Sequence, residues 1–252
     1  MKIISWNCNG SFRETIKSII DEDSENYLDG DIYVIAECEN PGDSRPKYNE
    51  YRKIIADLME SNYFWIGDYH FKGLGIFAKQ DIKLEPIKVQ DNKFKNFIAL
   101  RVNDSFNLLG VWAMNKDKEK GLPPYVQMIH SYFDANTDLF DENLIMCGDF
   151  NSNAIWDNLH KAKDNEGNAK NQSNLNKKLN NKGLYSAYHE LTGEKQGKET
   201  QFTFYQSKNL DQPYHIDYVY TAKNKIIDFK IGDAEKWIKL SDHMPIIFEI
   251  HE

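Results

Sequence analysis

Hydrophobic residues recur along this chain with two different periods. Apolar runs of strand length, either alternating or continuous, are typical of β-strands. They predict strands at residues 2–6, 31–36, 75–79, 97–102, 106–114, 144–147, 201–205, 215–221 and 245–250. Apolar residues at helical spacing predict helices near residues 12–20, 51–59 and 123–135, the last with proline in its first turn. The run at 31–36 is apolar almost throughout, which indicates a strand buried on both faces.

Residues 164–182 break this pattern. They are rich in Asn and Lys and poor in apolar side chains, so we interpret them as an exposed, flexible insertion with at most one polar helix. No internal repeat and no Pro/Ser-rich linker divides the chain, which favours a single domain over residues 1–252. Strands alternate with helices early and dominate later, so the pattern predicts an α/β or α+β sandwich with mixed sheets.

Composition narrows the class of protein. The chain has 252 residues, of which 40% are hydrophobic and 28% charged, an ordinary globular balance. Its 31 Lys and Arg against 39 Asp and Glu give a net charge of −8, which disfavours a protein that coats nucleic acid indiscriminately. Cys8, Cys38 and Cys147 are not spaced as the ligands of a metal site are. Their odd number argues against a disulfide framework, so we expect a cytoplasmic protein. No apolar run approaches the roughly 18 residues of a membrane span, so we expect no membrane partner.

The surplus of carboxylates raises the question of a metal site. Polar side chains recur where predicted strands end, and loops at strand ends commonly carry active sites in α/β proteins. They are Asn7, Asn9, Glu37, Asn115, Asp149, Asn151, Asp217, Asp242 and His243. Carboxylates, amides and an imidazole suit a hard cation such as Mg²⁺ or Mn²⁺. Each residue alone has an ordinary explanation; Gly148-Asp149-Phe150-Asn151, for example, has the composition of a turn. We expect His215 to be a surface histidine.

The combination of these residues is far more specific than any one of them. Six motifs follow one another along the chain: Ser5-Trp6-Asn7-Cys8-Asn9-Gly10, Ile35-Ala36-Glu37, Gly73-Leu74-Gly75-Ile76, Gly148-Asp149-Phe150-Asn151, Ile216-Asp217-Tyr218 and Ser241-Asp242-His243-Met244-Pro245. In this order they resemble the motifs of the endonuclease/exonuclease/phosphatase superfamily. The resemblance implies a four-layer α/β sandwich, with two mixed β-sheets packed face to face and helices on the outside. It also implies Mg²⁺- or Mn²⁺-dependent hydrolysis of a phosphoester by water.

The resemblance assigns roles to individual residues. Glu37 is the expected metal ligand, and Asn9 and Asp242 complete the metal site directly or through water. Asn9 stands where some abasic-site nucleases have aspartate, so the metal would meet one negative charge fewer.

A second group of residues is expected to act on the attacking water and the phosphate. Asp149 orients or deprotonates the water, while Asn7 and Asn151 bind the phosphate or hold Asp149. Asp217 accepts a hydrogen bond from His243, which fixes the tautomer of the imidazole and raises its pKa. Either Asp149 or His243 takes the proton of the water.

The substrate is less well determined than the chemistry. Asn115 is the expected phosphate contact. Trp112 stands where DNA-repair relatives have tyrosine, and it either stacks on a base or packs in the core. Lys116 begins a basic segment, with Lys118 and Lys120, that suits a polynucleotide track.

The sequence is compatible with three functions. The leading hypothesis is a monomeric, exonuclease III-like nuclease acting on DNA. The second is a phosphatase or phosphodiesterase for a small-molecule or lipid-linked phosphoester. The third is a catalytically silent binding module, which the complete set of acidic and imidazole residues disfavours.

Overall fold

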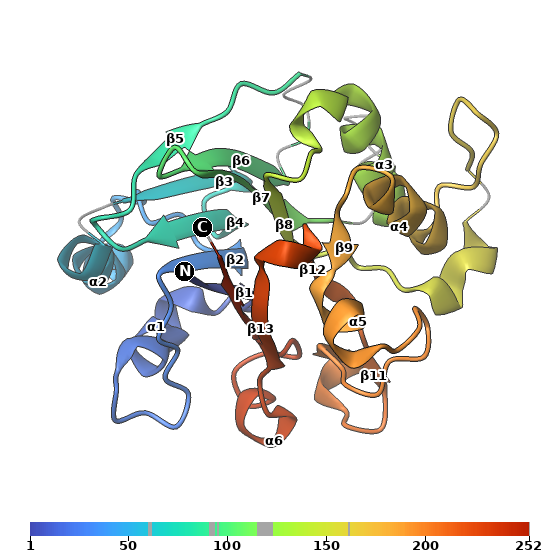
Figure 1. The fold of residues 1–252 in the computed structure, drawn as a ribbon. Coiled ribbons are helices and arrows are strands. Elements are labelled where there is room, and N and C mark those ends of the chain that lie inside the picture. The colour runs from blue at the N-terminus through green and yellow to red at the C-terminus, as the bar shows by residue number, and fades with distance from the viewer. Residues whose placement is uncertain (60–61, 91–93, 95, 115–122, 161, 252) are drawn as a thin grey trace.

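The computed structural model describes residues 1–59, 62–90, 94, 96–114, 123–160 and 162–251, and its main feature is a pair of six-stranded β-sheets (Figure 1). The first sheet has the order β13 (Ile226–Ile231), β14 (Ile246–Ile250), β1 (Lys2–Asn7), β2 (Ile32–Cys38), β4 (Lys72–Ala78) and β3 (Tyr63–Tyr69). The second has the order β5 (Leu84–Pro86), β6 (Phe97–Val102), β7 (Phe106–Trp112), β8 (Leu144–Asp149), β12 (Asp217–Thr221) and β9 (Tyr185–Ser186). β1 pairs with β2, and β7 with β8, in parallel, whereas the other pairs are antiparallel, so both sheets are mixed.

Helices lie outside the two sheets. They are α1 (Phe12–Ile20), α2 (Asn49–Met59), α3 (Val126–Ala135), α4 (Gln172–Asn180), α5 (Ala187–Thr192) and α6 (Ala234–Trp237). Short 3₁₀ segments occur at Pro46–Tyr48 (η1), Thr137–Leu139 (η2), Ala154–Leu159 (η3), Gln206–Lys208 (η4) and Lys223–Lys225 (η5). A two-stranded ribbon joins β10 (Phe204–Tyr205) to β11 (Pro213–Tyr214).

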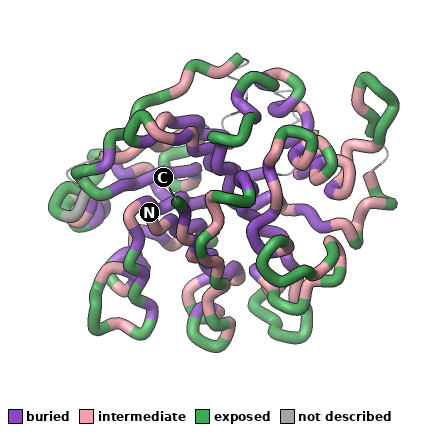
Figure 2. Tube along the Cα trace, in the orientation of Figure 1, coloured by how far each residue is buried: buried purple, intermediate pink, exposed green. Residues whose placement is uncertain are grey.

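Three buried clusters separate four layers. One cluster combines side chains of β1, β2, β4 and β14 with side chains of β6, β7 and β8, so it fills the space between the sheets. The second joins β6, β7 and β8 to α3 and α4. The third joins β1 and β2 to α1 and α2. Figure 2 shows the buried backbone gathered along the strands with exposed loops around it. The predicted sandwich of two mixed sheets is therefore confirmed.

Neighbouring residues on the central strands serve different layers. Val34 packs between the sheets, whereas Ile35 packs under the first sheet's helices. Likewise, Ile145 lies between the sheets and Met146 under α3 and α4. Successive side chains of a strand point to opposite faces, so a strand in the middle of four layers needs apolar residues at every position. This requirement explains the continuous apolar runs in the sequence.

Several sequence predictions differ from the structure. Residues 164–182 contain one polar helix, α4, as the sequence allowed. The interpretation of this region as an exposed insertion is wrong, because Leu175 and Leu179 of α4 are fully buried against the second sheet. The third predicted helix begins at Val126, after Pro123 and Pro124 rather than with a proline in its first turn. Strands β3, β5, β9, β11 and β13 were not predicted. Within the predicted strand at 201–205, only Phe204–Tyr205 is a strand.

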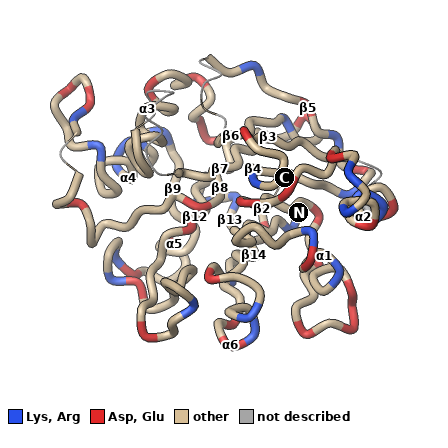
Figure 3. The backbone as a smooth tube through the Cα atoms, turned by 180° about the vertical axis from the view of Figure 1, so that it is seen from behind, with Lys and Arg blue, Asp and Glu red and all other residues tan. Residues whose placement is uncertain are grey.

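Charged residues lie mainly on the loops and helices, where Lys and Arg are interspersed with Asp and Glu (Figure 3). A search of the described helices finds none with the length and apolar character needed to cross a membrane.

Candidate active site

Strand ends from both sheets bring the predicted site residues together. Asn7 is the last residue of β1, in the first sheet, and Asp149 is the last residue of β8, in the second. Asp217 begins β12, which runs antiparallel to β8, and it lies directly opposite Asp149. His243 lies in the short segment that precedes β14 and bridges to Phe204. The site therefore lies where the two sheets meet at one rim.

Two amides hold the Asp149 carboxylate in place. Asn7 donates from Nδ2 to Asp149 Oδ2 at 2.9 Å. Asn151 donates from its backbone N–H to Oδ1 at 2.8 Å and from Nδ2 to Oδ2 at 2.8 Å. Burial of Asp149 raises the pKa of its carboxyl group to about 7, and the charge of Asp217 acts in the same direction, against His243 and the amide donors. A carboxylate with such a pKa exchanges a proton readily near neutral pH.

Asp217 and His243 form a buried pair. His243 Nδ1 lies 3.0 Å and 3.2 Å from the two carboxylate oxygens of Asp217, as expected from the sequence. Burial opposes protonation of the imidazole, but the charges of Asp217 and Asp149 outweigh it and raise the pKa of His243 to about 9. At pH 7 the imidazole therefore carries a positive charge between two carboxyl groups.

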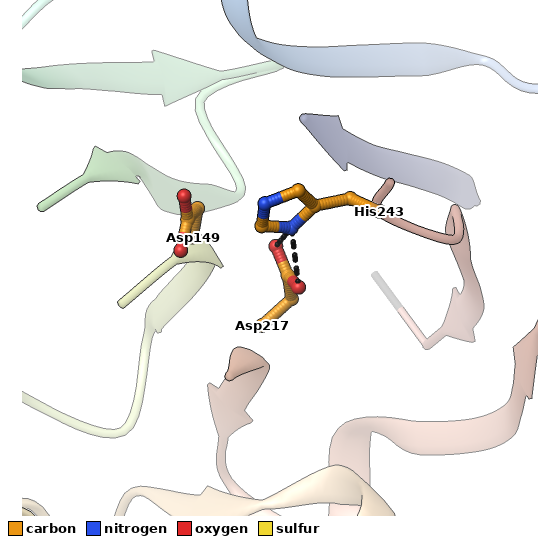
Figure 4. A group of neighbouring side chains, drawn as sticks. All are labelled: Asp149, Asp217 and His243. Carbon is orange, nitrogen blue, oxygen red and sulfur yellow. Dashed lines mark hydrogen bonds and ion pairs between the residues drawn. The ribbon is translucent and has the colours of Figure 1, made fainter. Parts of the chain in front are cut away.

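Figure 4 shows this imidazole between Asp149 and Asp217, with contacts drawn to Asp217 only. Among the described residues, Asp149, Asp217 and His243 form the group of carboxylate and imidazole side chains whose ligand atoms all lie within 4.8 Å of one another. Because the other ring nitrogen is turned toward Asp149, a small group between the two side chains can contact both.

The backbone around His243 is fixed by residues that sequence analysis did not assign. Ser241 Oγ donates to the Asn7 carbonyl at 2.7 Å and accepts from the His243 N–H at 3.0 Å. Trp6 Nε1 donates to the His243 carbonyl at 2.9 Å. Both residues belong to recognised motifs, so their positions in the sequence were a usable signal.

Thr203 is a further residue that the sequence did not indicate. Its fully buried hydroxyl accepts hydrogen bonds from the backbone N–H groups of Ile216 and Asp217, each at 3.0 Å. It thereby fixes the start of β12 and the direction in which the Asp217 side chain leaves the strand. A threonine within an ordinary strand-like run carries no signal of this role.

Three predicted site residues have left-handed backbone conformations. Asn9, Glu37 and Asn151 have φ values of 52°, 63° and 47°. A positive φ is uncommon for residues other than glycine and for Glu is costly, so it persists where the surroundings require it. At Glu37 the register between β2 and β4 also shifts, so the strand bulges at this residue and redirects its side chain.

The predicted metal ligands lie around the end of β1. The Asn9 N–H donates to Asn7 Oδ1 at 3.0 Å, and Ser241 Oγ lies 3.5 Å from Asp242 Oδ1. Glu37 belongs to the neighbouring strand β2, and its Oε2 lies 2.7 Å from Lys72 Nζ. Neither Glu37 nor Asp242 belongs to the compact group of Asp149, Asp217 and His243. Oxygen donors of this kind suit Mg²⁺ or Mn²⁺.

The burial of His215 corrects one prediction, and the burial of Trp112 decides between two alternatives. His215 is not a surface histidine: it is buried, its Nδ1 lies 2.9 Å from the Gln201 carbonyl, and its ring packs on Tyr188. Trp112 packs in the core between the sheets rather than standing free to stack on a base, with Lys72 Nζ 5.5 Å from its ring centroid. Asn115 and Lys116 lie outside the described residues, as do Lys118 and Lys120.

Comparison with known proteins decides the family. The Endonuclease/Exonuclease/phosphatase family matches the sequence over residues 4–243. The chain belongs to this family. It is therefore a hydrolase that acts on phosphoester bonds, and the expected four-layer fold is the fold of its structural neighbours.

Solved structures similar to this chain include DNA-acting enzymes. The 3'-5' exonuclease NExo from Neisseria meningitidis is 20% identical, with a TM-score of 0.65 over 100% of both chains. A Neisseria 3' phosphatase bound to a product DNA hairpin is 18% identical, with a TM-score of 0.66 and the same coverage. An AP endonuclease from Archaeoglobus fulgidus is 15% identical, with a TM-score of 0.65 over 100% of both chains. No curated protein matches the sequence. At these identities the similarity concerns the fold.

Proposed function

We propose that this member of the family is a Mg²⁺- or Mn²⁺-dependent DNA nuclease of the exonuclease III-like type. The observation that carries the proposal is the pair of Asp149 and His243, which face one another across the rim while each is fixed by separate partners. The names of the similar structures, an exonuclease, a DNA 3' phosphatase and an AP endonuclease, favour DNA among phosphoester substrates.

The proposed chemistry follows from the charges of these groups. Asp149 accepts the proton of the attacking water, because its pKa near 7 matches a general base that acts at neutral pH. His243 keeps its proton and donates a hydrogen bond to a phosphoryl oxygen, because Asp217 stabilises the imidazolium. Asn7 and Asn151 hold the base in its acceptor geometry. We therefore propose that Asp149, rather than His243, takes the proton of the water.

A divalent cation is required because the rim is rich in carboxylates and would repel a phosphodiester. Glu37, Asn9 and Asp242 would hold this cation, which supplies charge neutralisation and polarisation of the phosphate. Glu37 lies at the bulge of β2 and forms an ion pair with Lys72.

We also propose that residues 1–252 form one catalytic domain, which acts as a monomer in the cytoplasm. The first and last strands, β1 and β14, are neighbours in one sheet, which supports a single folding unit. The three cysteines are free and buried, as suits a reducing compartment.

A substrate panel tests the proposed function. Purified protein would be incubated with MgCl₂ or MnCl₂ and with single-stranded DNA, duplex DNA, RNA, inositol phosphates and sphingomyelin. We expect cleavage of DNA, its loss in EDTA and its loss in the Asp149→Asn variant. Hydrolysis of a small-molecule or lipid phosphoester with no action on any polynucleotide would replace DNA with the alternative substrate class.

A further inference from the structure

A buried network of polar side chains lies beside the catalytic groups and has no role in the chemistry described so far. Asn153, in the segment that follows Asp149, is buried, and its Nδ2 donates to the His215 carbonyl at 2.8 Å. The Tyr218 hydroxyl donates to the same carbonyl at 3.0 Å. Asn153 therefore ties the chain that leaves Asp149 to the chain that leads into Asp217.

The side-chain amide of Asn153 is held in one orientation from both ends. Its Oδ1 accepts a hydrogen bond from the Ile155 N–H at 3.0 Å and so caps η3. Its Nδ2 lies 3.2 Å from Glu199 Oε2. Because the amide oxygen faces an N–H donor, the NH₂ group is the end that faces the Glu199 carboxylate and the His215 carbonyl, which are both acceptors.

Glu199 is a buried carboxylate outside the catalytic group. Its side chain is 4% exposed, and its Oε1 accepts from the Gly197 N–H at 2.9 Å and lies 3.1 Å from His189 Nε2. Burial disfavours ionisation of Glu199, but the hydrogen bonds from His189, Gly197 and Asn153 outweigh it and lower the pKa to about 2. Buried ionic groups often stabilise a fold no better than apolar side chains of similar volume, which favours a role in fixing geometry here.

The contact of Asn153 lies at the point where β8 and β12 separate. The Phe150 N–H donates to the Ile216 carbonyl at 3.0 Å, which continues the pairing of the two strands beyond Asp149 and Asp217. The Asn153 amide binds the carbonyl of the residue that precedes Ile216. It therefore fixes how the two strand ends lie relative to one another, and with them the two buried carboxyl groups.

We propose that Asn153 and Glu199 are positioning residues for the proposed nuclease reaction. Glu199 orients the amide of Asn153, and Asn153 holds the start of β12. Asp217 and the His243 bound to it are thereby kept in place beside Asp149. The inference rests on the proposed function, because it concerns the geometry of the groups that would act on water and phosphate. Both side chains are buried, so their replacement should lower kcat and leave KM nearly unchanged.

Two variants of nearly unchanged shape separate this role from a purely structural one. In Glu199→Gln an NH₂ group replaces one carboxylate oxygen and faces the NH₂ group of Asn153, so the Asn153 amide loses its fixed orientation. In the double variant Glu199→Gln with Asn153→Asp, the two side chains can again form a hydrogen bond, and Asp caps a helix as well as Asn does. The double variant still lacks the amide donor to the His215 carbonyl.

The test measures kcat and KM on DNA together with the free energy of unfolding in urea. We expect Glu199→Gln to lower kcat by about tenfold or more, because small displacements of catalytic groups have effects of this size. The double variant should be more stable than Glu199→Gln, but its kcat should stay low. Glu190→Gln is the matched control, because Glu190 is an exposed residue of α5 that pairs with Lys223, and this variant should keep the wild-type kcat.

Three outcomes would overturn the inference while leaving the nuclease function intact. The first is a wild-type kcat in Glu199→Gln. The second is a kcat that recovers together with stability in the double variant, and the third is loss of the folded state in both variants by circular dichroism; each of these two would indicate a structural role. If the wild-type protein cleaves no polynucleotide, the proposed function itself fails and the inference fails with it.

Discussion

Asp149 and Asp217 lie directly opposite one another on the antiparallel strands β8 and β12. Two buried carboxyl groups so placed repel each other when both are ionised, and the structure separates their roles by giving them different partners. Asn7 and Asn151 hold Asp149, whereas His243 is bound to Asp217. In the proposed mechanism, Asp149 acts on the water while Asp217 stabilises the His243 imidazolium.

Replacement of Asp149 should separate catalysis from stability. We expect Asp149→Asn to lower kcat by at least about 100-fold, because general-base catalysis typically contributes that much or more. The free energy of unfolding at pH 8 should stay the same or rise, because burial makes the ionised carboxylate costly. Steady-state kinetics and urea denaturation measure the two effects. A variant that loses both activity and stability would indicate a structural role for Asp149.

The His243 imidazole should titrate at an unusually high pH in the metal-free protein. NMR should give a pKa raised from 6.5 to about 9, and Asp217→Asn should lower it markedly, because the compensating charge is lost while the burial remains. A His pKa raised on folding contributes stability that is complete below about pH 6.5 and lost as the pH rises through about 9. An unchanged pKa in Asp217→Asn would contradict the role of this pair.

Metal binding should depend on Glu37. Titration of the apo protein with Mn²⁺ by calorimetry should show an apparent Kd about tenfold or more weaker in Glu37→Gln, because one negative ligand is lost. Glu50→Gln is the control, since Glu50 is exposed and pairs with Lys17 at the protein surface. Equal weakening in both variants would point to a general effect of charge rather than to a site at Glu37.

The backbone of β7 lies so close to Gly148 that adding a single methyl group there should strongly destabilise the fold. Gly148 has φ 141°, and a Cβ at this position would lie 1.9 Å from the Val111 carbonyl oxygen. Gly148→Ala should therefore cost more than about 3 kcal/mol of unfolding free energy. Gly193→Ala should cost only about 1–2 kcal/mol, since Gly193 has φ 72° and no neighbour within 4 Å of a Cβ. Similar losses in the two variants would contradict the packing of β8 on β7.

Helix α4 should contribute to the stability of the second sheet. Leu175→Ala removes a fully buried side chain and should cost about 2–5 kcal/mol in chemical denaturation. Lys177→Ala, on the exposed face of the same helix, should change the unfolding free energy by less than about 0.5 kcal/mol. If Leu175→Ala had as little effect as the control, residues 164–182 would after all behave as an insertion.

The sequence predicts the central strands well for a physical reason. β1, β2, β7 and β8 are buried on both faces, so their apolar runs are continuous and unmistakable. β13 was missed because it lies at a sheet edge and its side chains are only partly buried. The sequence allowed a polar helix in this region but not its burial, because Leu175 and Leu179 are sufficient to anchor α4 and are too few to produce a visible helical period.

The candidate site shows a similar division. Asp149, Asp217 and His243 were predicted because they stand in recognisable motifs, and the structure brings them together. His215 lies in one of the same segments, but its burial depends on Tyr188 and Gln201, which are distant in the sequence. The left-handed conformation of Glu37 also arises from its tertiary surroundings, because Glu, unlike Asn, has no local preference for a positive φ.

We propose above that Asp149 activates water for metal-dependent cleavage of a DNA phosphodiester. The most direct measurement follows cleavage of a labelled single-stranded oligonucleotide by the wild-type protein and by Asp149→Asn, each with Mg²⁺ and with EDTA. We predict products only for the wild-type protein with Mg²⁺, with full folding of both proteins by circular dichroism. Undiminished cleavage in EDTA, or by Asp149→Asn with Mg²⁺, would contradict the account.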